Sequence, residues 1–258
     1  MRAEYVEMTP PAARPRLNAL RVLGIGAHLV GGLATAALIF PFAPAAARFA
    51  LKRRWALRMI RALGVRLRVE GSAPVHGAIL VANHVSWLDV LAIASSAPVV
   101  FVAKSEVSGW PAIGWLAARA GTLFLKRSSG RSLLRVKNRI GALLLAGRGV
   151  ALFAEGTTSN GSAVLPFRSG LLQAAVDSAR PVQAVAIAYY DEDGESSEAA
   201  AFIDGMSLWQ SIGAICRCGR ITARLVVIPP LALAGRSRKE LAREARDAIT
   251  AALAQPLR

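Results

Sequence analysis

Residues 77–90 read GAILVANHVSWLDV and change character half-way. Small, branched and apolar residues fill the first half, as is typical of a short buried strand. His84 and Asp89 follow within a few residues, and apolar spacing then resumes. The pattern predicts a strand that turns into a helix, with two side chains capable of acid–base chemistry at the turn.

The rest of the chain repeats this alternation of short apolar runs and helical patterns. The expected strands lie at residues 65–70, 77–83, 98–104, 121–127, 149–155, 181–190 and 221–228. The expected helices lie at residues 87–95, 110–120, 132–146 and 170–178, and Ser237 opens a closing amphipathic helix. This order predicts an α/β fold with a mixed, largely parallel sheet flanked by helices.

The composition indicates a partner that carries negative charge. The 258 residues are 54% hydrophobic, and 32 basic against 16 acidic residues give a formal net charge of +16. A basic and apolar chain suits an anionic membrane or a phosphate-bearing ligand. No zinc-ligand spacing or aromatic RNA-binding signature points to nucleic acid. Cys216 and Cys218, the two cysteines, are expected to be structural thiols in a reducing compartment.

The N-terminal part has the composition of a membrane anchor. Residues 1–21 contain three prolines and scattered charges, so a mobile tail is expected. Residues 22–47 contain no charged residue, and residues 22–40 would span about 28 Å as a helix before Pro41 and Pro44 bend or end it. A membrane anchor, crossing once or bending at the prolines, is favoured over a cleaved signal peptide or a buried core helix.

The next stretch, residues 48–68, holds eight basic residues and no acid. Wound as a helix, it gathers an apolar face and a basic face: Leu51, Trp55, Met59, Ala62 and Leu63 against Arg53, Arg54, Arg58 and Arg61. This suits an interfacial helix on an anionic surface, with an ordinary surface helix as the alternative. Residues 22–63 are therefore expected to anchor a main domain of residues 64–258, which the basic excess places in the cytoplasm.

His84 and Asp89 allow two interpretations. On a single helix they would lie roughly 140° apart, but a turn between them brings the carboxylate to the imidazole. Such a pair orients the ring and stabilises its protonated form. Because no G-x-S-x-G motif supplies a serine nucleophile, His84 would deprotonate a substrate hydroxyl directly. Alternatively, Ser86 and Asp89 form a capping box, and His84 is structural.

Two further strand ends carry polar side chains. The segment 152–172, LFAEGTTSNGSAVLPFRSGLL, places Glu155, Gly156 and Thr157 on a polar loop after a strand. Lys126 and Arg127 end another strand and suit a phosphate. Each feature alone is weak, but their occurrence in order, each at a strand end, strengthens the prediction of one site.

The series resembles the glycerolipid acyltransferase family, most of all bacterial lysophosphatidic acid acyltransferases. The family's motif positions are matched by Asn83, His84 and Asp89, by Gly121, Phe124 and Arg127, by Glu155, Gly156, Thr157 and Ser159, and loosely by Pro181 and Val182. Phe153 stands one place closer to Glu155 than in some members, and residues 101–115 also resemble the family. The resemblance covers residues 64–230.

The resemblance implies a role for each matched residue. His84 would be the general base and Asp89 its orienting partner. Arg127 would bind the phosphate of the acceptor, while Glu155 and Gly156, with Thr157, would help to position it. Lys104 and Arg168 are expected as further substrate contacts. The acyl donor would be a thioester of acyl carrier protein or coenzyme A, with no metal and no bound cofactor.

The resemblance also implies an acceptor and a location. The acceptor would be a lysophospholipid, foremost 1-acyl-sn-glycerol-3-phosphate, which gives phosphatidic acid; lyso-ornithine lipid is the alternative. A non-catalytic lipid-binding protein of the same fold is the competing class, against which the intact His84–Asp89 pair argues. The expected location is the inner, cytoplasmic membrane, with the catalytic domain on the cytoplasmic side of an anionic surface.

Overall fold

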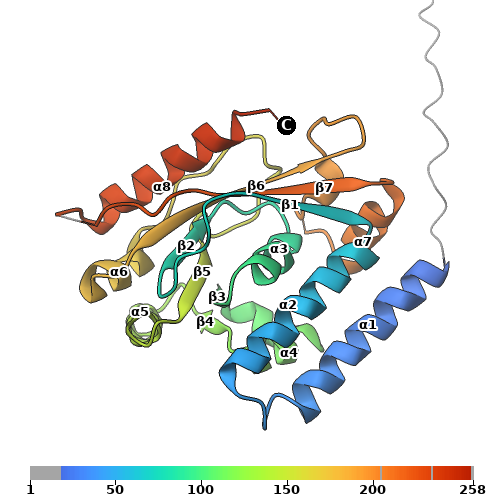
Figure 1. Ribbon diagram of the computed structural model, residues 1–258, viewed down its shortest axis with the longest axis horizontal. Helices are drawn as coiled ribbons and strands as arrows, with labels where there is room; N and C mark the ends of the chain where they lie inside the picture. The colour runs from blue at the N-terminus through green and yellow to red at the C-terminus, as the bar shows by residue number, and fades with distance from the viewer. Residues whose placement is uncertain (1–18, 204, 234, 257–258) are drawn as a thin grey trace, which may run out of the picture.

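The computed structural model describes residues 19–256 apart from Asp204 and Ala234, so nearly all of the tail expected at residues 1–21 lies outside the described residues. Its centre is a seven-stranded sheet in the order β1-β7-β6-β2-β5-β3-β4 (Figure 1). The strands are β1 Val65–Gly71, β2 Ile79–Ala82, β3 Val99–Lys104, β4 Leu123–Leu125, β5 Gly149–Phe153, β6 Val182–Tyr190 and β7 Ile221–Val227. Only the β6–β7 pair is antiparallel, so the predicted mixed, largely parallel sheet is confirmed.

Helices cover both faces of this sheet (Figure 1). They are α1 Ala19–Leu38, α2 Ala45–Ala62, α3 Leu88–Ser96, α4 Ile113–Arg119, α5 Gly130–Leu145, α6 Gln173–Ser178, α7 Leu208–Arg217 and α8 Arg238–Leu253. Strand β2 shows the division, because Leu80 and Ala82 face the core beneath α2, α3 and α7 while Ile79 and Val81 face the core beneath α5, α6 and α8. Alternate residues of a strand point to opposite faces, so a strand between two helix layers is apolar throughout.

The basic stretch of residues 48–68 divides at Ala62 into the expected helix and the expected strand at residues 65–70. Helix α2 ends there, and residues 65–68 belong to strand β1. Gly64 adopts a φ of 69°, in the left-handed region that ends helices and that glycine enters without strain. The basic residues continue through this break because the same side chains suit an exposed helix face and an exposed strand.

Helices α1 and α2 form an antiparallel hairpin at one end of the molecule (Figure 1). His28 and Trp55 join them reciprocally: Trp55 Nε1 donates to the His28 carbonyl at 3.1 Å, and His28 Nε2 lies 2.9 Å from the Trp55 carbonyl. Their rings stack with centres 5.5 Å apart. The hairpin is therefore a defined part of the fold.

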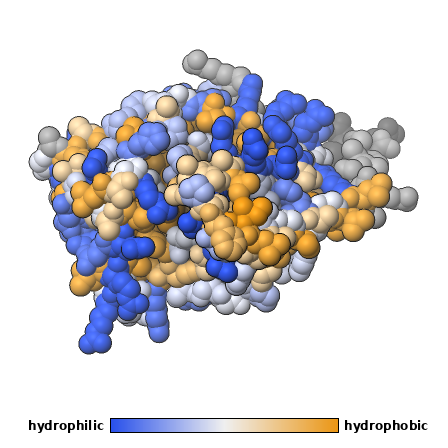
Figure 2. Space-filling model, turned by 60° about the horizontal axis from the view of Figure 1, so that its bottom comes forward, coloured by the Kyte–Doolittle hydropathy of each residue, from blue (hydrophilic) through white to orange (hydrophobic). Residues whose placement is uncertain are grey.

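The two helices expose different surfaces. Ala56, Met59 and Ile60 of α2 are buried in the protein core, while its four predicted outer arginines are exposed. Helix α1 is long and apolar enough to cross a membrane by length and composition, and only 17% of that stretch is buried within the chain. Figure 2 shows hydrophobic residues gathered beside strongly hydrophilic ones on the side of the molecule that lies lowest in Figure 1.

Candidate active site

The predicted polar residues lie together because their strands end at one edge of the sheet. His84 follows β2, Lys104 ends β3, Arg127 follows β4 and Glu155 follows β5. These four strands are parallel, so their carboxyl ends meet at the same edge. The folded chain therefore joins residues that are up to 71 positions apart, as between His84 and Glu155.

His84 and Asp89 form the hydrogen-bonded pair that the sequence predicts. His84 Nδ1 lies 2.8 Å from Asp89 Oδ2, and the histidine side chain is 19% exposed whereas the aspartate is fully buried. A carboxylate accepts hydrogen bonds, so we assign the proton to Nδ1. This leaves Nε2 with a lone pair available as a base.

Asp89 is held in place by three further donors. Its Oδ2 accepts the backbone N–H groups of Val85 at 2.8 Å and Ser86 at 2.9 Å. Its Oδ1 accepts the hydroxyl of Tyr189 at 2.6 Å. Burial, together with the adjacent Asp89 charge, raises the pKa of Tyr189 well above its usual value, so this hydroxyl stays protonated and donates. The carboxylate is fixed in the position that orients the imidazole.

The helix-capping alternative is true only in part. Asp89 accepts the Ser86 N–H, as a capping box requires, but Ser86 Oγ accepts from Leu88 N rather than from the amide of Asp89. The same carboxylate oxygen also bonds His84. Asp89 therefore has two roles at once: it stabilises the start of α3, and it orients the His84 ring.

The loop after β5 clamps the loop that carries His84. Glu155 Oε1 accepts the His84 N–H at 3.2 Å, and Ser159 N donates to the His84 carbonyl at 2.8 Å. The Phe153 ring stacks on the imidazole with centres 3.9 Å apart and planes 10° apart. Three contacts from one segment thus restrict both the backbone and the ring of His84.

Glu155 is buried beneath this contact. Burial raises its pKa to about 7, with the Asp89 charge acting in the same direction, while the backbone N–H groups of His84 and Leu165 and the charge of Arg246 oppose the rise. Its contact is with the histidine loop. Glu155 is therefore placed to position His84, and the adjacent Gly156 is also buried.

Arg127 and Arg168 lie beside Gly156, and Lys104 lies near enough to both arginines for their charges to act on it. A methyl group at Gly156 would lie 2.9 Å from Arg168 Nε and 3.1 Å from an Arg127 nitrogen, so only glycine fits without displacing them. Partial burial and the charges of Arg127 and Arg168 lower the pKa of Lys104, with Glu106 opposing. Partial burial and Arg168 likewise lower the pKa of Arg127. Within the described residues none of the three cations forms an ion pair, which suits them to bind an anion.

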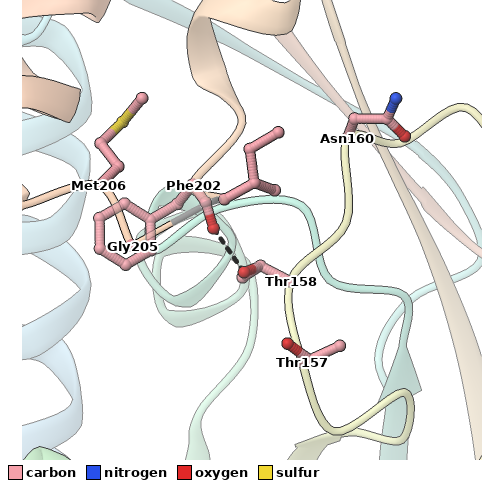
Figure 3. Close-up of a pocket in the computed structure, with 7 residues that line it drawn as sticks. Thr157, Thr158, Asn160, Phe202, Gly205 and Met206 are labelled. Atoms are coloured by element: carbon pink, nitrogen blue, oxygen red, sulfur yellow. Dashed lines mark hydrogen bonds between the residues drawn. The ribbon is translucent and has the colours of Figure 1, made fainter.

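Thr157 faces a separate hollow of about 490 Å³ next to the histidine loop. Figure 3 shows Thr157, Thr158 and Asn160 on one side, with Phe202 and Met206 on the other. The hydroxyl of Thr158 donates to the Phe202 carbonyl, and Phe202 N donates to Val85 at 2.9 Å. Phe202, which lines the hollow, is therefore hydrogen-bonded to Val85, the residue that follows His84.

Comparisons with known proteins agree with this geometry. A family model described as Acyltransferase matches residues 65–188. The lyso-ornithine lipid O-acyltransferase of Pseudomonas aeruginosa is 40% identical over 203 residues, which cover 79% of this chain and 78% of that protein. The chain belongs to the acyltransferase family.

Two further comparisons bear on this acyltransferase. A 1-acyl-sn-glycerol-3-phosphate acyltransferase of Neisseria meningitidis is 38% identical over 148 residues, covering 57% of this chain and 58% of that protein. The crystal structure of the 1-acyl-sn-glycerophosphate (LPA) acyltransferase from Thermotoga maritima matches with a TM-score of 0.66 at 21% identity, over 93% of this chain and 99% of that one. The first extends the family relationship, and the second confirms the fold.

Sequence reasoning missed the role of Tyr189 in this acyltransferase. Tyr189 lies in an expected strand, 100 positions from Asp89, and the two meet because β6 lies next to β2. Asn83 was matched to the family without a role, and the structure gives it one. Its amide bonds both the N–H and the carbonyl of Ile187, which extends the contact of β2 with β6 up to His84.

Proposed function

We propose that this acyltransferase moves a fatty acyl group from an acyl thioester to the free hydroxyl of 1-acyl-sn-glycerol-3-phosphate, which gives phosphatidic acid. One observation carries the proposal. The histidine–aspartate pair, with Nε2 of His84 available, lies at the same sheet edge as three cations that lack ion-pair partners among the described residues. A base for a hydroxyl and a site for a phosphate are the two requirements of this acceptor.

His84 Nε2 removes the proton of the acceptor hydroxyl as its oxygen attacks the thioester carbonyl. The tetrahedral intermediate collapses, the carbon–sulfur bond breaks, and the imidazolium returns the proton to the departing thiolate. Asp89 keeps the ring in the correct tautomer and stabilises the imidazolium. The thioester supplies the activation, so no metal and no bound cofactor takes part in these steps.

Lys104, Arg127 and Arg168 bind the acceptor phosphate in this proposal. An arginine can pair with a phosphate through two parallel hydrogen bonds, and a lysine adds a point charge. Gly156 lets the head group approach the two guanidinium groups, since any side chain there would fill the space. Thr157, the residue after Gly156, adds a hydroxyl for the head group. Glu155 accepts the backbone N–H of His84 and so helps to hold the histidine in place.

Lyso-ornithine lipid is the second candidate acceptor. It is favoured by the Pseudomonas aeruginosa relative, whose alignment covers more of this chain than that of the Neisseria meningitidis relative. Its head group is zwitterionic, so three clustered cations would contribute less to binding it. The cation cluster is therefore our reason for proposing the phosphate-bearing acceptor first.

The purified enzyme, assayed with both lysolipids and with acyl carrier protein and coenzyme A thioesters, tests the proposal. We expect a higher kcat/KM for 1-acyl-sn-glycerol-3-phosphate than for lyso-ornithine lipid with the better donor. A higher value for lyso-ornithine lipid would replace the acceptor and leave His84 and Asp89 in their roles. No transfer to either acceptor from either donor would contradict the proposed reaction.

We propose that the enzyme works at the inner, cytoplasmic membrane with its catalytic domain on the cytoplasmic side. Two observations support this location: the exposed apolar side of α1 and the exposed arginines of α2. An apolar helix inserts into lipid, and adjacent basic residues favour an anionic cytoplasmic surface. The acceptor is itself a membrane amphiphile, so an enzyme held at the surface meets it there.

A further inference from the structure

A second group of basic side chains surrounds Phe49 in the first half of α2. Lys52 Nζ lies 4.2 Å from the centre of the Phe49 ring, and the Arg148 guanidinium carbon lies 5.5 Å from the same centre. Arg48 is the neighbour of Phe49 in the chain. We call Arg48, Phe49, Lys52 and Arg148 the Phe49 cluster.

The Phe49 cluster lies at the opposite edge of the sheet from the active site. Lys52 Nζ donates to the carbonyls of Val99 at 3.5 Å and Ala120 at 3.2 Å. Val99 begins β3, and Arg148 immediately precedes β5. The catalytic residues follow the carboxyl ends of these parallel strands, so the cluster is separate from the proposed acceptor site.

The positive charge of the cluster has no counter-charge in the described part of the chain. None of its three cations forms an ion pair there, and Arg148 Nε is buried without a hydrogen-bond partner. Burial, with the charges of Arg148 and Arg48, lowers the pKa of Lys52 to about 8. Like charges held together in a partly buried site cost free energy, and a bound anion would offset that cost.

An exposed apolar turn adjoins the cluster. Arg48 Nε donates to the carbonyl of Ala43 at 2.8 Å, in the turn between α1 and α2. Phe42, next to Ala43, is 87% exposed, and Ile39 at the start of the turn is also exposed. Figure 1 shows this turn at the lower end of the helical hairpin. Cations beside exposed apolar side chains suit an amphiphile with an anionic head.

We propose that the Phe49 cluster is a second anion site, which binds the phosphate of an anionic phospholipid whose acyl chains lie against the turn at Phe42. The head group accepts hydrogen bonds from Arg148 and Arg48 and lies next to Lys52. This site holds the enzyme to lipid and is distinct from the site of the reaction.

The reactivity of Lys52 reports occupancy of the site. The full-length protein is treated with acetic anhydride at pH 8, and acetylation of each lysine is followed by mass spectrometry, with exposed Lys239 as the internal reference. Short-chain phosphatidylglycerol, below its micelle-forming concentration, should protect Lys52. If the bound anion raises the Lys52 pKa by about one unit, acetylation slows about fivefold. Phosphatidylcholine with the same chains should protect much less.

Two variants and a matched control locate the effect. Arg148→Gln should abolish protection by phosphatidylglycerol, and Arg48→Gln, at an exposed position that does not disturb the core, should weaken it. Arg54→Gln removes the same charge from the exposed side of α2 outside the cluster and should keep the protection. Circular dichroism confirms that each variant is folded.

Three results would overturn the proposal. The first is unchanged Lys52 acetylation at saturating phosphatidylglycerol. The second is equal protection in Arg48→Gln, Arg54→Gln and the unmodified chain. The third is equal protection by inorganic phosphate at the same concentration, which would show that the turn contributes nothing and that the ligand is not a lipid.

Discussion

At the residue scale, the proposed chemistry depends on Nε2 of His84. We expect His84→Ala to abolish acyl transfer, because the acceptor hydroxyl loses its base. Asp89→Asn should lower kcat by about 10³–10⁴-fold, as expected when the orienting aspartate of a catalytic histidine is replaced. The measurement is the initial rate with a thioester donor, alongside the melting temperature of each variant. Near-normal turnover by folded His84→Ala would remove the mechanism.

Arg127 offers a second test, with Lys126 as its matched control. Arg127 lies beside Gly156 and Arg168, whereas nothing places the exposed Lys126 side chain in that cluster. We expect Arg127→Ala to raise the KM for the phosphate-bearing acceptor at least tenfold, about 1.4 kcal/mol, and to leave the KM for the donor nearly unchanged. Lys126→Ala should change both values little. An equal rise in both KM values for Arg127→Ala would argue against a head-group contact.

Glu155 should give a pH dependence of stability. Its pKa is raised to about 7 in the folded protein against a usual value near 4.5, so the folded state favours the protonated form. The resulting stabilisation is complete below about pH 4.5 and is lost as the pH rises through 7. Glu155→Gln keeps an acceptor for His84 N–H and cannot ionise. We measure the free energy of unfolding of Glu155→Gln and of the unmodified chain by chemical denaturation. The value for Glu155→Gln minus the value for the unmodified chain should rise between pH 4.5 and 7 and level off above pH 7. A pH-independent difference would show that burial does not control this carboxyl.

The site could be predicted from the sequence wherever a polar residue interrupts an apolar pattern at a strand end. His84, Arg127 and Glu155 are of this kind, and Asp89 follows His84 in the first turn of α3. Tyr189 gives no such signal, because an aromatic residue is ordinary in a strand and its hydroxyl matters only through its contact with Asp89. The burial of Glu155 also gives no signal in the sequence. It depends on how the loop after β5 packs against the loop that follows β2.

At the scale of elements, the α1–α2 hairpin depends on close packing at Gly32, whose neighbour Gly31 has open surroundings. A methyl group at Gly32 would overlap Nε1 of the Trp55 ring, whereas one at Gly31 would meet nothing within 4 Å. Both residues lie within α1, so alanine should favour the helix equally at either position. The pair therefore separates helix propensity from close packing.

We expect Gly31→Ala to be neutral or stabilising by about 0.5–1 kcal/mol. Gly32→Ala should destabilise by about 1–3 kcal/mol, because α1 must move away from Trp55. Thermal unfolding in detergent, followed by tryptophan fluorescence, measures both variants. Equal stability of the two would indicate that the hairpin does not hold together as described.

The elements themselves were largely predictable, for a physical reason. Each expected strand is confirmed. The central strands are buried on both faces and are apolar runs bounded by turn residues, whereas the edge strand β1 alternates apolar and charged residues. Helix α7 is absent from the expected elements although its sequence carries helix signals: Leu208, Ile212 and Ile215 follow helical spacing, and Ser207 with Gln210 forms a capping box.

At the scale of the whole molecule, charge and apolar surface act together. The formal net charge of +16 favours anionic lipid, but attraction between exposed charges is screened over roughly 8–10 Å at physiological salt. Insertion of apolar side chains is not screened. Helix α1 presents an outward apolar side that includes Leu23, Val30 and Leu38. The effect of salt on membrane binding therefore shows how much of the binding comes from charge and how much from apolar insertion.

We expect the protein to sediment with membranes and to remain there in high salt, because α1 and the turn at Phe42 insert into the bilayer. Leu23→Lys with Val30→Lys places two charges on the outward side of α1 and should move a large share of the protein to the soluble fraction, since a lysine within the hydrocarbon costs about 2.5–3.5 kcal/mol. Leu145→Lys, at an exposed apolar position of α5, adds charge elsewhere and should leave the distribution unchanged. Fractionation followed by immunoblotting measures the distribution of the unmodified protein, of the double variant and of the Leu145→Lys control. Complete release by salt alone, or a mature N-terminus mapped near Arg48, would contradict insertion of α1.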